Sequence, residues 1–231
     1  MIKVSANKEI AQLIGGGLYK TSDVKIFAHR GFWKSESEKN TKNAFEYAFD
    51  NGFGIETDLR DIKGEIVISH DMPTGSEITF EEVLKLMNGR NLPLALNIKA
   101  DGMADKIKSL LVKYNQTNYF TFDMSIPEMI YQLKTGLNVF TGLSDIIKTP
   151  ILFEEAKGVW LDCFNFDWFG EEEISKIVNQ GKEVCIVSPD LHKREYKNVW
   201  EKYKNAVRNK EGVMLCTDYP NAAKEFFNDK S

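Results

Sequence analysis

The chain has 231 residues, of which 42% are hydrophobic and 28% charged, and its formal net charge at pH 7 is −4. This length is sufficient for one large core and falls in the range of a (β/α)₈ barrel. The slightly acidic balance argues against a nucleic acid as the main partner, and no apolar stretch approaches the roughly 20 residues that spanning a bilayer requires.

The cysteines and the first residues indicate a compartment. Residues 1–9 are too polar for the apolar core of a secretory signal. Cys163, Cys185 and Cys216 each lie in or beside an apolar run, which is typical of buried thiols in a reducing compartment and not of a disulfide framework. We therefore expect a cytoplasmic protein without stable membrane insertion. A short helix over Ile10 to Leu18 is expected below the sheet.

Short apolar runs and amphipathic stretches alternate along the rest of the chain. The predicted strands cover residues 25–28, 54–59, 65–71, 94–99, 119–122, 138–141, 159–162, 183–187 and 213–216. The predicted helices cover residues 41–51, 80–87, 103–114, 125–134, 150–156, 171–179, 194–208 and 221–227. This βα repetition implies a parallel sheet with helices outside. We expect an α/β protein, a single (β/α)₈ TIM barrel that forms one domain over residues 1–231.

Two of the three histidines follow predicted strands. His29 begins the sequence His29-Arg30-Gly31, and His70 precedes Asp71 at the end of a predicted β-hairpin. A lone histidine is more often a packed or surface residue, but two at strand ends of a barrel favour catalysis. Imidazole both takes and gives a proton near neutral pH, and the Arg30 guanidinium suits phosphate oxygens.

Acidic and amide side chains share one face of two further strands. Glu56 and Asp58 alternate with apolar neighbours, so both point the same way. A buried carboxylate pair is costly unless a cation or donors lie between them, and their spacing suits Mg²⁺ or Ca²⁺. The alternative is a solvated strand face or a salt-bridged pair. Lys99 lies two positions after Asn97 and either meets phosphoryl oxygens or faces solvent.

Polar residues in the second half of the chain permit more than one interpretation. Asp162 ends a predicted strand and could orient a hydroxyl or a neighbouring cation, or cap a helix or turn. Asp218 is interpreted mainly as a helix N-cap. In the loop after the seventh predicted barrel strand, Asp190 or Ser188 is expected to cap the following helix, with His192 exposed, although a loop at this face could also select the leaving group.

Residues Ile26 to Asp71 resemble the opening of the glycerophosphodiester phosphodiesterase family. The matching pieces are His29-Arg30-Gly31, Asn40-Thr41, Ala44-Phe45, Glu56-x-Asp58 and His70-Asp71, followed later by Leu96-Asn97-Ile98-Lys99 and the Thr217-Asp218-Tyr219-Pro220 turn. The resemblance implies a TIM barrel that hydrolyses a glycerophosphodiester to glycerol 3-phosphate and an alcohol. It also implies catalytic His29 and His70, substrate contacts from Arg30 and Lys99, and metal ligands Glu56, Asp58 and Asn97.

Two departures from the family pattern concern the substrate and the metal. Lys39 stands where the family usually has Glu, and it either meets an extra anionic group of the substrate or faces solvent. Asn97 stands where the family has a third metal-binding Glu. Its carbonyl oxygen can still bind a cation, but the lost charge should lower metal affinity or favour a metal shared with the substrate phosphate.

Three functions are compatible with these residues. The first is metal-dependent hydrolysis of a small soluble glycerophosphodiester, in which one histidine removes a proton from the nucleophile and the other protonates the leaving alcohol. The second is the same chemistry on another phosphodiester, such as a glycan-linked glycerol phosphate. The third is a binder of phosphate ligands without turnover. The intact histidine pair argues against the third.

Overall fold

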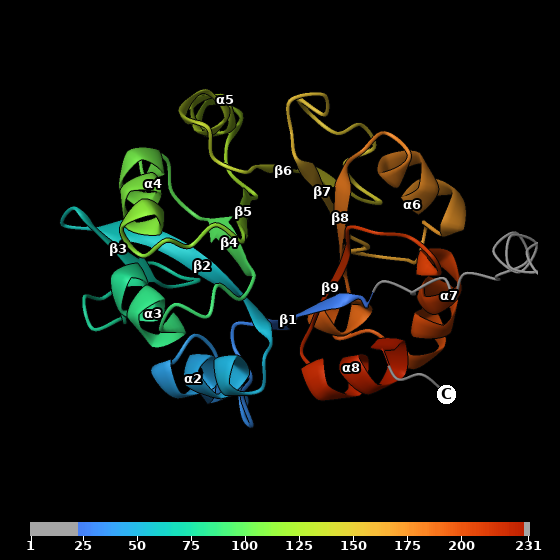
Figure 1. Ribbon diagram of the computed structural model, residues 1–231, viewed down its shortest axis with the longest axis horizontal. Coiled ribbons are helices and arrows are strands. Elements are labelled where there is room, and N and C mark those ends of the chain that lie inside the picture. The colour runs from blue at the N-terminus through green and yellow to red at the C-terminus, as the bar shows by residue number, and fades with distance from the viewer. Residues whose placement is uncertain (1–22, 229–231) are drawn as a thin grey trace, which may run out of the picture.

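Strands and helices alternate along the chain, and the helices lie outside a central sheet formed by the strands (Figure 1). The computed structural model describes residues 23–228, so the helix expected over Ile10 to Leu18 lies outside the described residues. The strands are β1 (Lys25–His29), β2 (Gly54–Ile62), β3 (Glu65–Ile68), β4 (Leu94–Ile98), β5 (Tyr119–Phe122), β6 (Phe140–Leu143), β7 (Gly158–Leu161), β8 (Glu183–Val187) and β9 (Val213–Thr217). The helices are α2 (Lys42–Asp50), α3 (Phe80–Met87), α4 (Ala104–Lys113), α5 (Ile126–Thr135), α6 (Glu171–Val178), α7 (Lys197–Val207) and α8 (Pro220–Asn228), with 3₁₀ turns η1 (Glu36–Glu38) and η2 (Pro189–His192).

Eight parallel strands form a nearly closed barrel. Their order in the sheet is β5-β4-β2-β1-β9-β8-β7-β6. The two ends of this order meet where Thr121 of β5 bridges Val139, just before β6, and the Thr121 amide donates to the carbonyl of Asn138 at 2.8 Å. The predicted (β/α)₈ TIM-barrel fold is therefore confirmed.

Strand β3, which lies outside the barrel order, turns back along β2 and pairs with it antiparallel. Lys63 and Gly64 join the two strands with φ angles of 49° and 81°. Two successive positive φ angles are those of a tight hairpin turn whose twist matches the strands. The hairpin returns the chain to His70, as the sequence predicted.

One predicted helix cap is confirmed, and one predicted helix does not form. Thr79 accepts a hydrogen bond from the amide of Glu82, and the Glu82 carboxylate accepts one from the amide of Thr79, which is a capping box at the start of α3. The helix predicted over Pro150 to Ala156 is wrong: this segment forms turns, because Leu152 has a φ of 52°, outside the right-handed helical region. No helix within residues 23–228 is long and apolar enough to cross a membrane.

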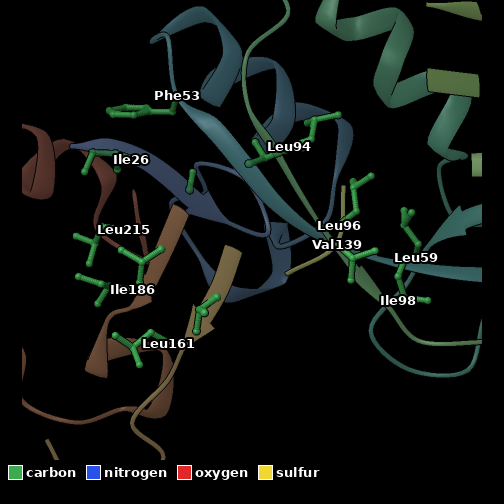
Figure 2. Packing of buried hydrophobic residues seen from close by; sticks show 14 of the residues in the cluster. Ile26, Phe53, Leu59, Leu94, Leu96, Ile98, Val139, Leu161, Ile186 and Leu215 are labelled. Carbon is green, nitrogen blue, oxygen red and sulfur yellow. The ribbon is translucent and has the colours of Figure 1, made fainter. Parts of the chain in front are cut away.

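Two layers of apolar side chains lie on the two sides of the barrel wall. The outer layer packs the strands against the helices, and Figure 2 shows part of it, with Ile26, Phe53, Leu59, Leu94, Leu96, Ile98, Val139, Leu161, Ile186 and Leu215 labelled. The inner layer fills the barrel and consists of Phe27, Ala95, Phe120, Phe122, Phe140, Trp160, Cys185, Val187, Met214 and Cys216. All three cysteines are buried and free, as the sequence predicted.

The inner layer explains where the polar residues gather. Successive residues of a strand point to opposite faces, so inward positions recur every second residue. Two residues after Phe27 the next inward residue is His29, and the corresponding steps lead from Ala95 to Asn97 and from Trp160 to Asp162. The apolar layer thus ends, at the carboxyl ends of the strands, in a ring of polar side chains.

Candidate active site

A cavity of about 290 Å³ opens above the apolar layer at the carboxyl ends of the strands. All seven site residues predicted from the sequence line it: His29, Arg30, Glu56, Asp58, His70, Asn97 and Lys99. This is the end of a TIM barrel at which active sites are built. The third histidine of the chain, His192, lines the same cavity.

His29 is held by a carboxylate from the other end of the chain. Its Nδ1 lies 2.7 Å from Asp218 Oδ1, and its Nε2 lies 3.8 Å from Glu56 Oε2. Hydrogen bonding of Nδ1–H to Asp218 favours the tautomer whose Nε2 faces the cavity with a free lone pair. Asp218 was predicted mainly as a helix cap. That prediction is wrong, because its side chain faces His29.

The sharp turn after β1 directs Arg30 into the cavity. Arg30 has a φ of 57° and Gly31 a φ of 91°. A Cβ at Gly31 would lie 2.8 Å from the Cβ of Ala44 and 2.9 Å from its carbonyl carbon. Only glycine fits both this φ and this close approach to α2, which explains the residue order His29-Arg30-Gly31.

Asp58 lies in the middle of a cluster of donors and cations. Its Oδ2 accepts a hydrogen bond from Asn40 Nδ2 at 2.9 Å and lies 3.2 Å from Arg30 Nε, and its Oδ1 lies 3.6 Å from Lys99 Nζ. Asn40 also accepts from the Thr57 hydroxyl at 2.8 Å. The Asn-Thr motif of the sequence therefore positions Asp58, and these contacts offset the cost of burying the carboxylate.

Glu56 and Asn97 carry buried oxygens without a partner. Neither Glu56 Oε2 nor Asn97 Oδ1 makes a hydrogen bond within the described residues, although both are buried. Burial, and then repulsion by Asp58, raises the pKa of Glu56 well above its usual value, while Arg30 and Lys99 oppose this shift. Unpartnered buried oxygens are rare because each costs desolvation energy. An ion or substrate group in the cavity would satisfy both.

The chemistry of these oxygens suits a hard divalent cation, and one of the three side chains, Asn97, is uncharged. Carboxylate and amide oxygens are suitable ligands for Mg²⁺ or Ca²⁺, and Asp58 and Asn97 are register partners on β2 and β4. Within residues 23–228, no group of three or more His, Cys, Asp and Glu side chains is arranged to hold a metal ion. Asn97 is an amide, so Glu56, Asp58 and Asn97 together would offer a cation at most two negative charges.

His70 is more exposed than His29. Its side chain is 48% exposed, and its Nδ1 lies 2.9 Å from Asp71 Oδ1. The guanidinium of Arg60 donates to the carbonyl of His70 at 3.1 Å and to that of Lys99 at 3.3 Å, which ties the His70 loop to the end of β4. Sequence reasoning missed Arg60 and the hydrogen bonds by which it holds the His70 loop in place.

The side chain of Lys39 packs against Trp33 and beside Asp218. Its Nζ lies 4.4 Å from the centre of the Trp33 ring and 3.8 Å from Asp218 Oδ2, and its side chain is only 18% exposed. The solvent-facing alternative is therefore wrong. The lysine adds a positive charge beside the carboxylate that holds His29.

The loop after β8 lines the other side of the cavity. His192 Nε2 lies 2.7 Å from Asp162 Oδ1 and its side chain is 24% exposed, so the expectation that His192 is exposed is wrong. Asp190 does not cap a helix; its carboxylate accepts hydrogen bonds from the Ser188 hydroxyl, the Thr217 hydroxyl and the Asp218 amide. Through the hydrogen bond from the Asp218 amide to Asp190, the loop after β8 helps to fix the position of Asp218.

Comparison with known proteins identifies the fold. No family model matches the sequence, and no curated protein sequence matches it. The crystal structure of a glycerophosphodiester phosphodiesterase from Agrobacterium tumefaciens is similar, with a TM-score of 0.66 and 15% identity over 89% of this chain and 100% of that one. A phosphodiesterase from Oleispira antarctica, solved in complex with the product sn-glycerol-3-phosphate, gives a TM-score of 0.61 and 14% identity over 90% of this chain and 98% of that one. The chain has the fold of the glycerophosphodiester phosphodiesterases. The resemblance stated from the sequence is thus confirmed at the level of the fold, with low identity.

Within this phosphodiesterase fold, sequence reasoning found the residues near the family motifs and missed those that reach the cavity from elsewhere. Asp218 lies in a turn that the sequence analysis had quoted, but pairing across 189 residues gives no local pattern. Asp162 and His192 are also distant in sequence, so their contact gives no local pattern. The sequence showed only that polar residues follow the two apolar strands.

Proposed function

We propose that the protein is a metal-dependent phosphodiesterase that cleaves a glycerophosphodiester to glycerol 3-phosphate and an alcohol. The observation that carries the proposal is one cavity in which two histidines, two fixed cations and two unpartnered buried oxygens converge. The fold likeness to a phosphodiesterase with bound sn-glycerol-3-phosphate supports it. We infer a small phosphodiester as substrate, no nucleic-acid partner, a cytoplasmic location and a role in lipid metabolism.

Glu56, Asp58 and Asn97 would hold the divalent cation, Mg²⁺ or Ca²⁺. Such a cation, when bound, neutralises charge on a phosphodiester oxygen and makes phosphorus more electrophilic. Glu56 must lose its proton for this, and its raised pKa means that the cation competes with that proton. Because Asn97 brings no charge, we expect weaker binding than three carboxylates would give.

Arg30 and Lys99 would neutralise the remaining phosphoryl oxygens. Both side chains line the cavity and lie within 3.6 Å of Asp58, which fixes their positions. Fixed charges aimed at the site where negative charge develops stabilise the transition state without reorganisation.

His29 and His70 would move the protons. With Nδ1 bonded to Asp218, His29 Nε2 removes a proton from the nucleophile, and Asp218 stabilises the imidazolium that forms. His70 protonates the departing alcohol oxygen. If the nucleophile is a neighbouring hydroxyl of the substrate, the product is a cyclic phosphate, and the two histidines exchange roles when water opens it.

Phosphodiesterase assays test this function. Glycerophosphocholine, glycerophosphoethanolamine and bis(p-nitrophenyl) phosphate are each incubated with EDTA, Mg²⁺ or Ca²⁺. The proposal expects metal-dependent release of glycerol 3-phosphate. Hydrolysis of bis(p-nitrophenyl) phosphate alone would support phosphodiesterase chemistry and reject choline and ethanolamine as the leaving alcohols. No turnover under any condition would favour a protein that binds phosphate ligands without cleaving them.

A further inference from the structure

We propose that Asp162 and His192 form a subsite for a hydroxylated group of the substrate, such as a polyol or sugar alcohol, opposite the phosphate-binding residues. This inference rests on the proposed function, because it names the group attached to the phosphate. It also concerns residues for which the sequence motifs predicted no definite role. All three histidines of the chain line one cavity, and only two are needed for proton transfer.

The position of the pair in the barrel indicates which part of a substrate it would meet. Around the barrel the strands follow the order β1, β2, β4, β5, β6, β7, β8, β9, so β7 lies four places from β2 and β8 four places from β4. Asp162 follows β7 and His192 follows β8. The pair therefore stands across the cavity from the wall of Glu56, Asp58 and Asn97. A phosphate held at that wall would direct one of its substituents toward the pair.

The hydrogen bonds of the pair leave one acceptor and one ring nitrogen for a ligand. Asp162 Oδ1 lies 2.7 Å from His192 Nε2 and also accepts from the amide of Cys163 at 2.7 Å. Asp162 Oδ2 and His192 Nδ1 make no hydrogen bond with the part of the chain that the structure describes. A hydroxyl both donates and accepts, so neighbouring hydroxyls of one ligand suit these two atoms.

The charges of the pair favour a neutral group over a charged one. The hydrogen bond to Asp162 raises the pKa of His192 and so favours the protonated ring, whose charge offsets that of the carboxylate 2.7 Å away. A quaternary ammonium would compete with His192 for Asp162. A second phosphate would be repelled by Asp162 directly beside His192. A neutral hydroxylated alcohol meets neither penalty.

Aromatic rings complete this side of the cavity. The rings of Trp160 and Phe122 stack with centroids 3.9 Å apart, and the ring of Phe164 lies 4.9 Å from that of His192. All of these residues line the cavity. Apolar walls with a few convergent polar groups are typical of small-molecule sites, and a polyol presents C–H groups to the rings and hydroxyls to the polar pair.

A substrate series with matched variants tests the subsite. The alcohols compared are inositol, a polyhydroxylated ring, and choline, a cation without a free hydroxyl in the diester, each linked to glycerophosphate. We expect the wild type to favour glycerophosphoinositol, and Asp162→Asn and His192→Phe to lower the ratio of the two kcat/KM values about tenfold, as for one lost hydrogen bond. Asp167→Asn is the control, because it breaks the 2.7 Å Arg194–Asp167 ion pair between the same two loops without touching the cavity.

The outcomes distinguish a substrate-binding role of Asp162 and His192 from a purely structural contact between their two loops, and a failure of this role from a failure of the proposed function. An unchanged ratio in Asp162→Asn and His192→Phe, or an equal change in Asp167→Asn, would overturn the subsite. If the wild type hydrolyses neither these diesters nor bis(p-nitrophenyl) phosphate, the proposed function is rejected but the subsite is not. Calorimetric titration of the same two diesters then tests whether the subsite binds a hydroxylated group. Tighter binding of glycerophosphoinositol that Asp162→Asn removes would support the subsite, and equal affinity would refute it.

Discussion

The two halves of the cavity are built in different ways. On the β1–β2–β4 side, His29 and Glu56 are register partners, as are Asp58 and Asn97, so strand pairing itself fixes their spacing. On the β6–β7–β8 side, His192 reaches Asp162 from a loop, and Phe164 comes from another loop. Side chains on paired strands keep their geometry more strictly than side chains on loops. We infer that the strand side performs the chemistry and the loop side selects the substrate.

The largest expected effect belongs to the two histidines assigned to proton transfer, His29 at the end of β1 and His70 in the loop after β3. His29→Ala and His70→Ala should each lower kcat by a factor on the order of 10²–10⁴, because each removes an acid or base. Steady-state assays measure the loss, and circular dichroism checks that the fold survives. Activity retained in either variant would sink the two-histidine scheme.

The next largest effect concerns the metal affinity of the proposed ligands Glu56, Asp58 and Asn97. Asn97→Asp adds a third negative charge beside Glu56 and Asp58, and the metal concentration that half-saturates activity should fall about tenfold, since ligand charge tunes affinity. In EDTA the same variant should melt at a lower temperature than the wild type, because three buried carboxylates repel one another. Asn51→Asp, after α2 and away from the cavity, is the control for the metal requirement and should leave it unchanged. An unchanged metal requirement in Asn97→Asp would remove residue 97 from the ligand set.

The carboxylate behind His29 should matter less than the histidine itself. Asp218→Asn keeps the size of the side chain but no longer favours the Nδ1–H tautomer, so kcat should fall by less than in His29→Ala while the KM for the diester stays near its wild-type value. Glu36→Gln is the control, because Glu36 contacts Lys39 from the solvent side and is 67% exposed. Full activity of Asp218→Asn would mean that the pair is structural only.

The smallest effect concerns stability and compares a glycine from each half. Gly31→Ala should lower the free energy of unfolding by about 1–3 kcal/mol, because its φ is 91° and the new Cβ would lie 2.8 Å from that of Ala44. Gly142 also lines the cavity, but a Cβ there would meet only Ile147 Cδ1 at 3.6 Å, an ordinary contact. Gly142→Ala should therefore be tolerated. Urea unfolding of both variants measures the difference, and equal stability would contradict the tight fit of the turn after β1.

The sequence predicted local elements and strand-end residues better than contacts between distant loops. Alternation of residue types correctly predicted that Glu56 and Asp58 share one inward face, and the hairpin composition correctly predicted that the chain returns to His70 beside β2. Both features depend on residues that are neighbours in the chain. The pairing of Asp218 with His29 depends on closure of the barrel, which brings β9 beside β1. The helix predicted over Pro150 to Ala156 failed because one residue, Leu152, adopts a left-handed backbone.

One measurement tests the central claim most directly. The products of glycerophosphodiester hydrolysis are followed by phosphorus NMR for the wild type and His29→Ala, in Mg²⁺, in Ca²⁺ and in EDTA. We predict glycerol 3-phosphate from the wild type with a divalent cation, and none in EDTA or from His29→Ala. No product in any wild-type arm, or equal release by His29→Ala, would contradict a phosphodiesterase site in this cavity.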